Sequence, residues 1–483
     1  MTIDQLRPAQ GVFINNRWNA EFSGREIDVY EPATGKIFAR ISAGGQHEIE
    51  LAVTAARRAQ EGTWGRLTAT ERGRILSEIA RRIEDEGEDL AVLEAQDTGK
   101  PIRQARADIV AAARYFEYYG GAADKVHGDT IPFMEGYFVA TERLPHGITG
   151  HIIPWNYPAQ MFGRTLAPAL AMGNACILKP AEDACQTPLR LAQIAADAGL
   201  PPGALAVVPG AGAEAGAALA QHPGIDFISF TGSPEVGVFV QEAAARNYIG
   251  CTLELGGKSP QLIFDDADLD KAVPVIINAI VQNSGQTCSA GARVLVQASV
   301  QERLTEMLCA RFSELRVGTP EMDLDLGPVI NMRQKERIER MLSLAEKDSV
   351  PLLAEGKISA STDGYFVPPK LYGPVPQDHP LAREEVFGPV LSMQLFETEG
   401  DAIALANGTD YALVASVWSR DTGRAMRVAR QISAGQVYIN SYGAGGGIEL
   451  PFGGMRKSGH GREKGFEALI EFSTLRTIVV KHD

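Results

Sequence analysis

Two segments of this chain carry side chains suited to chemistry on a carbonyl group. Glu254 ends an apolar run within residues 253–258, where burial is expected to raise the pKa of its carboxyl group and make it a usable base near neutral pH. Cys288 lies in a turn rich in Gly, Ser and Thr, residues 283–291. A thiol is a good nucleophile toward a carbonyl, and its tetrahedral adduct becomes a hydride donor once the oxyanion is stabilised. This chemistry requires a nicotinamide close to the thiol.

Asn156 is a candidate for stabilising that oxyanion. It follows the apolar run 150–153 and precedes a predicted helix, so it lies where a strand meets a loop. Its amide can donate a hydrogen bond to the developing negative charge. Taken alone, each candidate has a plainer interpretation: a turn asparagine between prolines, a solvated surface glutamate and a structural cysteine. The hypothesis of catalysis depends on their occurring together.

A phosphate-binding segment is indicated more weakly. Gly232 and Gly237 form a GxxxxG pattern that closes one predicted strand and opens a helix, with Ser233 at the junction. Backbone N–H groups at a helix N-terminus can hold a pyrophosphate. The pattern differs from the GxGxxG fingerprint, and Val238 after the second glycine excludes a Walker A loop. Residues 257–259 resemble the end of such a loop, but Thr252 stands where its first glycine is required.

The elements around these residues alternate between apolar strands and helices. Strands are predicted at 150–153, 175–178, 204–208 and 225–230, and helices at 187–198, 213–221 and 234–246. Apolar strands separated by helices predict a parallel, doubly wound sheet that binds ligands at the carboxyl ends of its strands. A second αβ series follows, with helices at 269–282 and 300–315. The region before about residue 148 is predicted to be helical, with a capping box of Thr68 and Glu71 ahead of a helix at 74–84.

Composition limits the classes of function. A chain of 483 residues is too long for one hydrophobic core, so at least two large domains are expected. The net charge of −14, with no dense basic run, argues against nucleic-acid binding. The lack of a signal-peptide core or a long apolar run predicts a cytoplasmic protein that does not enter membranes. The cysteines are odd in number without CxxC spacing, and no HExxH or clustered ligands occur, so no disulfide framework and no metal are expected.

Together these segments resemble the NAD(P)-dependent aldehyde dehydrogenase superfamily, and the match runs over nearly the whole chain, from residues 13–15 to the closing strand. The resemblance implies an α/β fold with three parts. These are a Rossmann-like doubly wound NAD-binding domain (1–125 and 144–256), an α/β catalytic domain (257–455) and a small β oligomerisation arm (126–143 and 470–483). It also implies a homodimer or homotetramer that acts on a small aldehyde.

The resemblance assigns a role to each candidate residue. Cys288 is implied as the nucleophile, Glu254 as the base that activates water for thioester hydrolysis, and Asn156 with the Cys288 backbone N–H as the oxyanion hole. The implied cofactor-binding residues are Lys179 and Glu182 at the adenosine ribose, Ser233 at the pyrophosphate, Glu385 at the nicotinamide ribose and Phe387 beside the nicotinamide, together with Trp155, Gly212, Gly232 and Gly237. Tyr157 and Arg164 are implied at the substrate.

The expected cofactor and the expected product each depend on one carboxylate, Glu182 for the cofactor and Glu254 for the product. Glu182 would repel the 2′-phosphate of NADP and accept hydrogen bonds from the ribose hydroxyls of NAD, so NAD is the expected cofactor. Because Glu254 is present, hydrolysis to a free acid is expected rather than acyl transfer to coenzyme A. The alternative is a thiol-dependent hydrolase or esterase that uses Cys288 and Glu254 without redox chemistry. In that case the alternating middle region and the segment around Glu385 would have no purpose.

The chain departs from the family pattern at two neighbouring positions. Eight residues past Asn156, many members carry Trp in the substrate tunnel, whereas this chain has Arg164. Semialdehyde dehydrogenases place an Arg there to hold a substrate carboxylate, which suggests an acidic or polar-tailed aldehyde. The alternative is a guanidinium paired internally with an acid. The next residue is Thr165, at a position where many members carry a Lys. That Lys often joins a proton relay with the Glu of a Gly-Arg-Glu motif, which is Glu463 in this chain. The sequence therefore leaves the relay role of Glu463 undecided.

Overall fold

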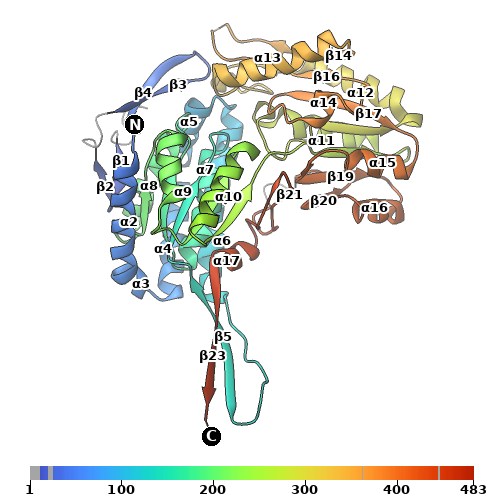
Figure 1. Cartoon of the computed structure of the whole chain (residues 1–483). Helices are drawn as coiled ribbons and strands as arrows, with labels where there is room; N and C mark the ends of the chain where they lie inside the picture. Colours follow the sequence, from blue (N-terminus) through green and yellow to red (C-terminus); the bar gives the residue numbers. More distant parts are fainter. Residues whose placement is uncertain (1–10, 20–24, 362, 444–446, 483) are drawn as a thin grey trace.

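The computed structural model describes residues 11–19, 25–361, 363–443 and 447–482. These residues form two α/β halves, each built around one large sheet, and a two-stranded arm that projects from the first half (Figure 1). The predicted α/β fold, with a doubly wound cofactor sheet, a second α/β unit and small β elements, is confirmed.

The first sheet has eight strands in the order β2-β1-β8-β7-β6-β9-β10-β22. They are β1 (Val12–Ile14), β2 (Arg17–Asn19), β6 (Ile148–Ile152), β7 (Ala175–Lys179), β8 (Leu205–Val207), β9 (Phe227–Thr231), β10 (Gly250–Glu254) and β22 (Gly459–His460). The strands from β8 to β10 are parallel, whereas β1, β2 and β22 pair antiparallel with their neighbours. The four strands predicted from apolar runs are β6 to β9. The strand order reverses between β6 and β9, where doubly wound sheets bind ligands.

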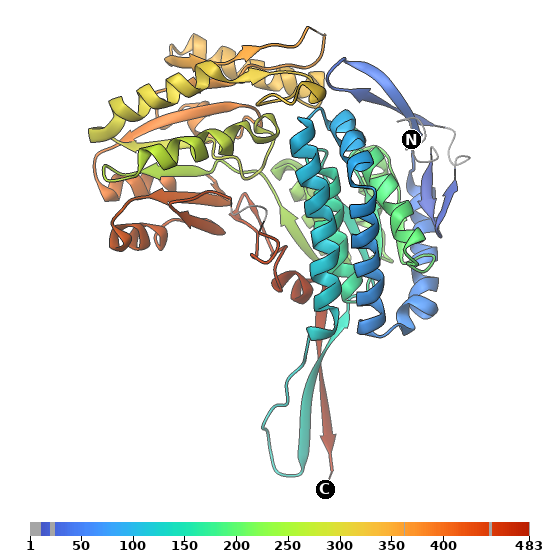
Figure 2. The same ribbon diagram turned by 180° about the vertical axis from the view of Figure 1, so that it is seen from behind.

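Helices cover both faces of this sheet. One face carries α2 (Gln46–Glu61), α9 (Ala217–Gln221) and α10 (Pro234–Arg246), and the other carries α7 (Pro158–Ala171) and α8 (Gln186–Asp197). Outside α7 and α8 pack α4 (Ala69–Asp85), α5 (Gly87–Thr98) and α6 (Ile102–Ala122), which Figure 2 shows from behind. The predicted capping box is present, because the Thr68 hydroxyl accepts from the Glu71 N–H while Glu71 accepts from the Thr68 N–H.

The second sheet has seven strands in the order β14-β16-β17-β12-β11-β19-β20, of which only β14 is antiparallel to its neighbour. The strands are β11 (Pro260–Ile263), β12 (Arg293–Gln297), β14 (Leu352–Glu355), β16 (Lys370–Tyr372), β17 (Val390–Phe396), β19 (Val414–Trp418) and β20 (Gln436–Ile439). The helices are α11 (Leu269–Val281), α12 (Gln301–Glu314), α13 (Met332–Lys347), α14 (Pro380–Arg383), α15 (Glu399–Ala406) and α16 (Thr422–Ala429). Both helices predicted for this region, α11 and α12, are present.

The arm consists of β5 (Tyr137–Pro145) and β23 (Ser473–Lys481), which pair antiparallel along their whole length. Several of its apolar side chains are exposed, among them Phe138, Leu475, Ile478 and Val479. The predicted domain boundaries stay a prediction. The strand β22, which lies beyond the predicted boundary at residue 455, pairs with β10 of the first sheet. In the part of the chain that the structure describes, no helix is both long enough and apolar enough to cross a membrane.

Two sequence predictions of secondary structure need correction. The predicted helix at 213–221 begins as a π-helical turn, Gly212–Gly216, and becomes α-helical only in α9. Two glycines in that turn weaken the α-helical hydrogen-bond pattern. The region before residue 148 also contains strands, including the hairpin of β3 (Glu26–Glu31) and β4 (Lys36–Ser42). These strands are short and partly exposed, so their apolar alternation is weak.

Candidate active site

The loop that carries Cys288 has an unusual backbone. It follows a short helical turn, η3 (Gln282–Gly285), in which Asn283, Ser284 and Gly285 have φ values of 48°, 55° and 73°. Left-handed backbone is costly for non-glycine residues and persists where neighbours impose it. Here Asn283 N donates to Gln104 Oε1 at 2.9 Å, and Ser284 Oγ donates to the Gly327 carbonyl at 2.8 Å. The position of the thiol is therefore set by a loop that these hydrogen bonds hold in place.

Asn156 lies directly beside this loop. Its side-chain Nδ2 donates to the Gln286 backbone carbonyl at 2.9 Å. The backbone carbonyl of Asn156 accepts from Lys100 Nζ at 3.1 Å and from Asn283 Nδ2 at 2.8 Å. A side-chain amide has two N–H donors, so one remains for a group bound at the thiol. The next residue, Tyr157, hydrogen-bonds Thr287 Oγ1 at 2.7 Å through its hydroxyl. The loop between β6 and α7 is thus fastened to the segment just before Cys288.

Glu254 ends β10 and is almost completely buried, with 1% of its surface exposed. Its Oε2 lies 3.4 Å from Arg164 Nη2. Burial raises the pKa of Glu254 well above its usual value, Arg164 opposes that rise and Glu463 adds to it. Neither carboxylate oxygen of Glu254 accepts a hydrogen bond from a group that the structure describes. The carboxyl group is therefore suited to exchanging a proton at a pH above the usual range of a carboxyl group.

Arg164 lies between two acids. Besides the contact with Glu254, its Nε forms a close ion pair with Glu463 Oε2, and its guanidinium stacks over the ring of Phe452 at 4.5 Å. The side chain also lines the cavity beside Cys288, but it is 4% exposed. This arrangement is the internal pairing that the sequence left as the alternative to substrate binding. Its role at the substrate stays a prediction.

A chain of buried hydroxyls continues from Glu463 into the sheet. Ser229 Oγ donates to Glu463 Oε1 at 3.0 Å, Thr165 Oγ1 donates to Ser229 Oγ at 3.0 Å, and His151 Nδ1 lies 2.6 Å from Thr165 Oγ1. Thr165 is therefore part of the polar network although it has replaced the lysine common in the family. The sequence did not predict that Arg164 would face Glu463. No local sequence pattern indicates which of two adjacent helical residues faces an acid that lies far away in the chain.

The thiol opens into a cavity of about 420 Å³ between the two halves. Its lining residues include Asp108, Tyr157, Cys288, Tyr442, Phe452 and Lys464. The surrounding protein raises the pKa of Cys288 to about 12, and Arg164 offsets only part of that effect while Glu254 adds to it. The sulfur is therefore a neutral thiol at neutral pH, and its proton leaves as the carbonyl carbon is attacked. A cavity of this size takes a small molecule.

The predicted cofactor residues of the first half, among them Lys179 and Ser233, lie at or just after the carboxyl ends of strands β7 and β9. Lys179 ends β7, and its Nζ lies 2.8 Å from Glu182 Oε2. Burial alone would raise the pKa of Glu182, but the charge and hydrogen bond of Lys179 lower it, so the group is a carboxylate. Ser233 caps α10, where it accepts from Val236 N. Its hydroxyl stands at a helix N-terminus, an electropositive place for phosphate.

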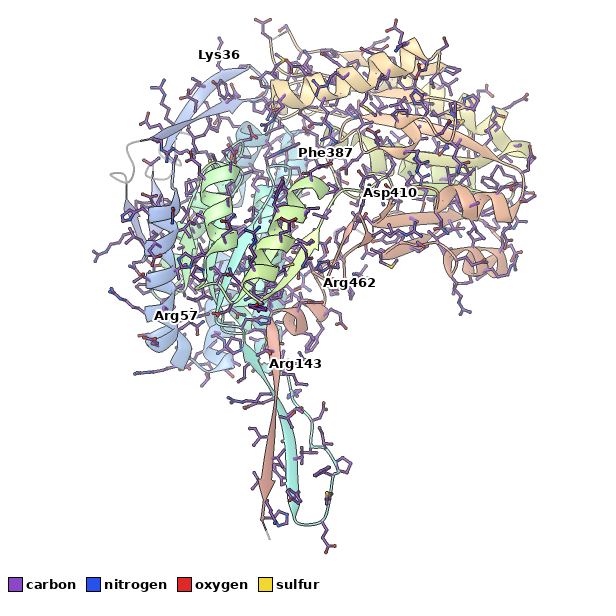
Figure 3. The ribbon with its side chains drawn as sticks, in the orientation of Figure 1. Lys36, Arg57, Arg143, Phe387, Asp410 and Arg462 are labelled. Atoms are coloured by element: carbon purple, nitrogen blue, oxygen red, sulfur yellow. The ribbon has the colours of Figure 1, made fainter. Side chains whose placement is uncertain are left out.

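The residues predicted to hold the nicotinamide riboside are aromatic and acidic. Trp155 and Phe387 contact each other edge to face, with ring centroids 5.4 Å apart, and Figure 3 shows Phe387 at the junction of the two halves. Glu385 Oε1 accepts from Gly257 N at 2.9 Å, and burial raises the pKa of Glu385 to about 7. A carboxylate, a helix N-terminus and an aromatic pair are the kinds of group that hold a ribose, a phosphate and a nicotinamide ring, so the residues present fit a dinucleotide.

The glycines predicted at the cofactor differ in their surroundings. A side chain at Gly212 would meet nothing within 4 Å, so this position is open to a ligand. At Gly237 a Cβ would lie 2.8 Å from the Leu255 side chain, and at Gly232 it would lie 2.5 Å from the ring of Phe230. Gly237 therefore lets α10 lie close to the Leu255 side chain, which directly follows β10, whatever its role toward a phosphate.

Comparison with known proteins gives consistent matches along the chain. The family model described as "Aldehyde dehydrogenase family" matches residues 18–478. Retinal dehydrogenase 2 of Homo sapiens is 41% identical over 475 residues, which make up 97% of this chain and 91% of that protein.

Solved structures agree. A protein from Burkholderia cenocepacia described as an aldehyde dehydrogenase is 56% identical, with a TM-score of 0.97 over 98% of this chain and 100% of that one. The NAD+ complex of betaine aldehyde dehydrogenase from Staphylococcus aureus is 34% identical, with a TM-score of 0.96 over 100% of this chain and 97% of that one.

Proposed function

This chain belongs to the aldehyde dehydrogenase family, and we propose that it uses NAD to oxidise an aldehyde through a thioester on Cys288, with the free carboxylic acid as product. The observation that carries the proposal is that Cys288 and Arg164 line one cavity, while Asn156 hydrogen-bonds the backbone two residues before the thiol and Glu254, at the end of β10, lies 3.4 Å from Arg164. The test is to follow NADH absorbance with an aldehyde panel and to identify the acid product. NADH formation without acid, or ester cleavage without NADH, would refute it.

Oxidation begins at the thiol. The sulfur of Cys288 bonds to the aldehyde carbon while the thiol proton leaves to solvent in the cavity. The oxygen then accepts hydrogen bonds from Asn156 Nδ2 and the Cys288 backbone N–H, which stabilise its negative charge. Bound NAD supplies the hydride acceptor, and loss of the hydride with re-formation of the carbonyl leaves a thioester on Cys288. The rigid loop around residues 283–285 keeps the sulfur in place during both changes.

Hydrolysis then releases the acid. Glu254 takes a proton from water as the water oxygen bonds to the thioester carbon, and the carbon–sulfur bond breaks as the carbonyl re-forms. The departing sulfur recovers a proton, which restores the thiol. Because a carboxylate does this work, the rate of this step falls as the pH drops through the raised pKa of Glu254.

The binding mode that we propose for NAD places the adenosine ribose at Lys179 and Glu182, the pyrophosphate at Gly212, Gly232, Ser233 and Gly237, and the nicotinamide riboside at Glu385, Phe387 and Trp155. The carboxylate of Glu182 sets the preference for NAD over NADP, because it repels a 2′-phosphate. We expect Glu182→Gln to shift the ratio of kcat/KM for NAD to that for NADP toward NADP by about tenfold or more. Steady-state kinetics with both cofactors measure this. A wild-type ratio near one would contradict the assignment.

Arg164 acts as a positioning residue for Glu254. Its charge opposes the rise in the pKa of that carboxyl group, so Arg164→Gln is expected to move the acidic limb of the pH profile of kcat to higher pH. At neutral pH the rate would fall by about 10- to 100-fold for charged and neutral aldehydes alike. Arg164→Lys should restore part of the rate. If instead only the KM of carboxylated aldehydes rises, Arg164 binds substrate directly.

The aldehyde that we propose is a polar or carboxylated semialdehyde. It is held in the cavity near Tyr157 and the two cations of the lining, Arg164 and Lys464. The active protein is a homodimer or homotetramer whose subunits join partly through the arm. The exposed apolar side chains of β5 and β23, such as Phe138 and Leu475, support this because an isolated two-stranded sheet is only marginally stable.

A further inference from the structure

Lys464 is a cation on the cavity wall that no step above uses. It lines the same cavity as Cys288, and it is only partly buried, so a ligand in the cavity can reach it. Its backbone is left-handed, with φ of 61°. Long side chains rarely adopt this conformation, and where they do so the position often has a functional reason.

Hydrogen bonds on both sides of Lys464 impose that conformation. Glu463 and Phe452 exchange two backbone hydrogen bonds, of 2.6 and 2.7 Å, and Gly465 N donates to the Ile448 carbonyl at 2.7 Å. The segment that carries Lys464 is thus pinned to the stretch that ends at Phe452. The ammonium lies 5.2 Å from the centre of the Phe452 ring, at the cavity.

The three charged side chains that the structure describes in the cavity lining are Asp108, Arg164 and Lys464. Two of them are cations, so this lining favours an anion. Asp108 forms a close ion pair with Lys100, which also lies 3.0 Å from Glu94. Arg164 is held by Glu254 and Glu463. Burial lowers the pKa of Lys464 to about 8, which still leaves it largely protonated at neutral pH.

We propose that Lys464 binds a terminal carboxylate of the aldehyde, and that this residue, and not Arg164, makes the enzyme specific for a short semialdehyde. The inference rests on the proposed function and names its substrate class. One ammonium balances the single negative charge of a carboxylate, whereas a phosphate dianion would leave one charge uncompensated in the cavity. A cationic tail is disfavoured, because Arg164 and Lys464 already lie over the ring of Phe452 that a cation would contact.

The test compares three aldehydes of similar size on each preparation: succinate semialdehyde (anionic), butanal (neutral) and betaine aldehyde (cationic). The enzymes are the wild type, Lys464→Met, Lys464→Arg and a control, Lys271→Met, whose side chain is 80% exposed. The ratio of kcat/KM for succinate semialdehyde to that for butanal does not depend on the folded fraction. Loss of a charge-assisted hydrogen bond predicts that Lys464→Met lowers this ratio by about 10- to 100-fold, mainly through KM.

The expected pattern has three further parts. The wild type prefers succinate semialdehyde to butanal, Lys464→Arg keeps most of that preference, and Lys271→Met leaves it unchanged. An unchanged ratio in Lys464→Met, or a wild type that prefers butanal or betaine aldehyde, would overturn the role of Lys464. Failure of the wild type to reduce NAD with any aldehyde would instead overturn the proposed function.

Discussion

Replacing Cys288 with serine is expected to lower NAD-dependent aldehyde oxidation by about 10⁴-fold or more, because a neutral hydroxyl in this cavity is a much poorer nucleophile than sulfur. The thiol itself is not ionised at rest, since burial raises the pKa of Cys288 to about 12. Activity therefore depends on the intrinsic reactivity of sulfur, on the oxyanion donors and on the fixed loop. Steady-state NADH formation measures the loss.

The matched control is Cys309→Ser. Cys309 is also partly buried but lies on α12, where its sulfur contacts the Leu353 carbonyl. This variant should keep nearly full activity. NAD binding, followed by quenching of tryptophan fluorescence, should survive in Cys288→Ser, because the proposed cofactor residues are separate from the thiol. Activity that persists in Cys288→Ser, or is lost equally in Cys309→Ser, would contradict the role of Cys288.

Glu254→Gln is expected to separate the two halves of the reaction. Attack and oxidation do not require the carboxylate in this mechanism, so a burst of about one NADH per subunit should remain. Hydrolysis requires it, so the steady-state rate should fall by about 10²- to 10⁴-fold. Stopped-flow absorbance resolves the two phases.

The pH dependence gives a second readout for Glu254. The base acts only when it is deprotonated, and burial raises its pKa. The wild-type steady-state rate should therefore rise with pH at values above the usual range of a carboxyl group, and Glu254→Gln should lose this limb. Absence of the burst in Glu254→Gln would mean that the same carboxylate also deprotonates the thiol.

Much of the fold is readable from the sequence because the strands of the first sheet are buried on both faces. Strands β6 to β9 are almost entirely buried and appear in the sequence as mainly apolar segments, and α10 has the bounds predicted for it. The short hairpin β3–β4 is partly exposed and lacks this signal. The π-helical start of residues 212–221 depends on hydrogen-bond geometry that propensity alone does not specify.

The residues of the candidate site likewise include some that the sequence identifies and some that only the folded structure brings together. The carboxylate at the end of β10 and the thiol-bearing turn were identified as candidates from residue type and position. Arg164 shows the limit, because its position is near the cavity as expected while its guanidinium faces Glu254 and Glu463. Glu463 is separated from Arg164 by about 300 residues, so only the folded chain shows which charges meet. The sequence around Lys464 likewise gives no sign that its side chain lines the cavity beside Cys288.

The most direct test of the covalent mechanism is to locate the intermediate. Glu254→Gln is mixed with NAD and succinate semialdehyde, quenched in acid during the slow phase, digested and analysed by mass spectrometry. The account predicts an acyl group, equal in mass to the aldehyde less one hydrogen, on the peptide that contains Cys288 and on no other. An unmodified Cys288 peptide despite a full NADH burst, or an acyl group on another residue, would contradict it.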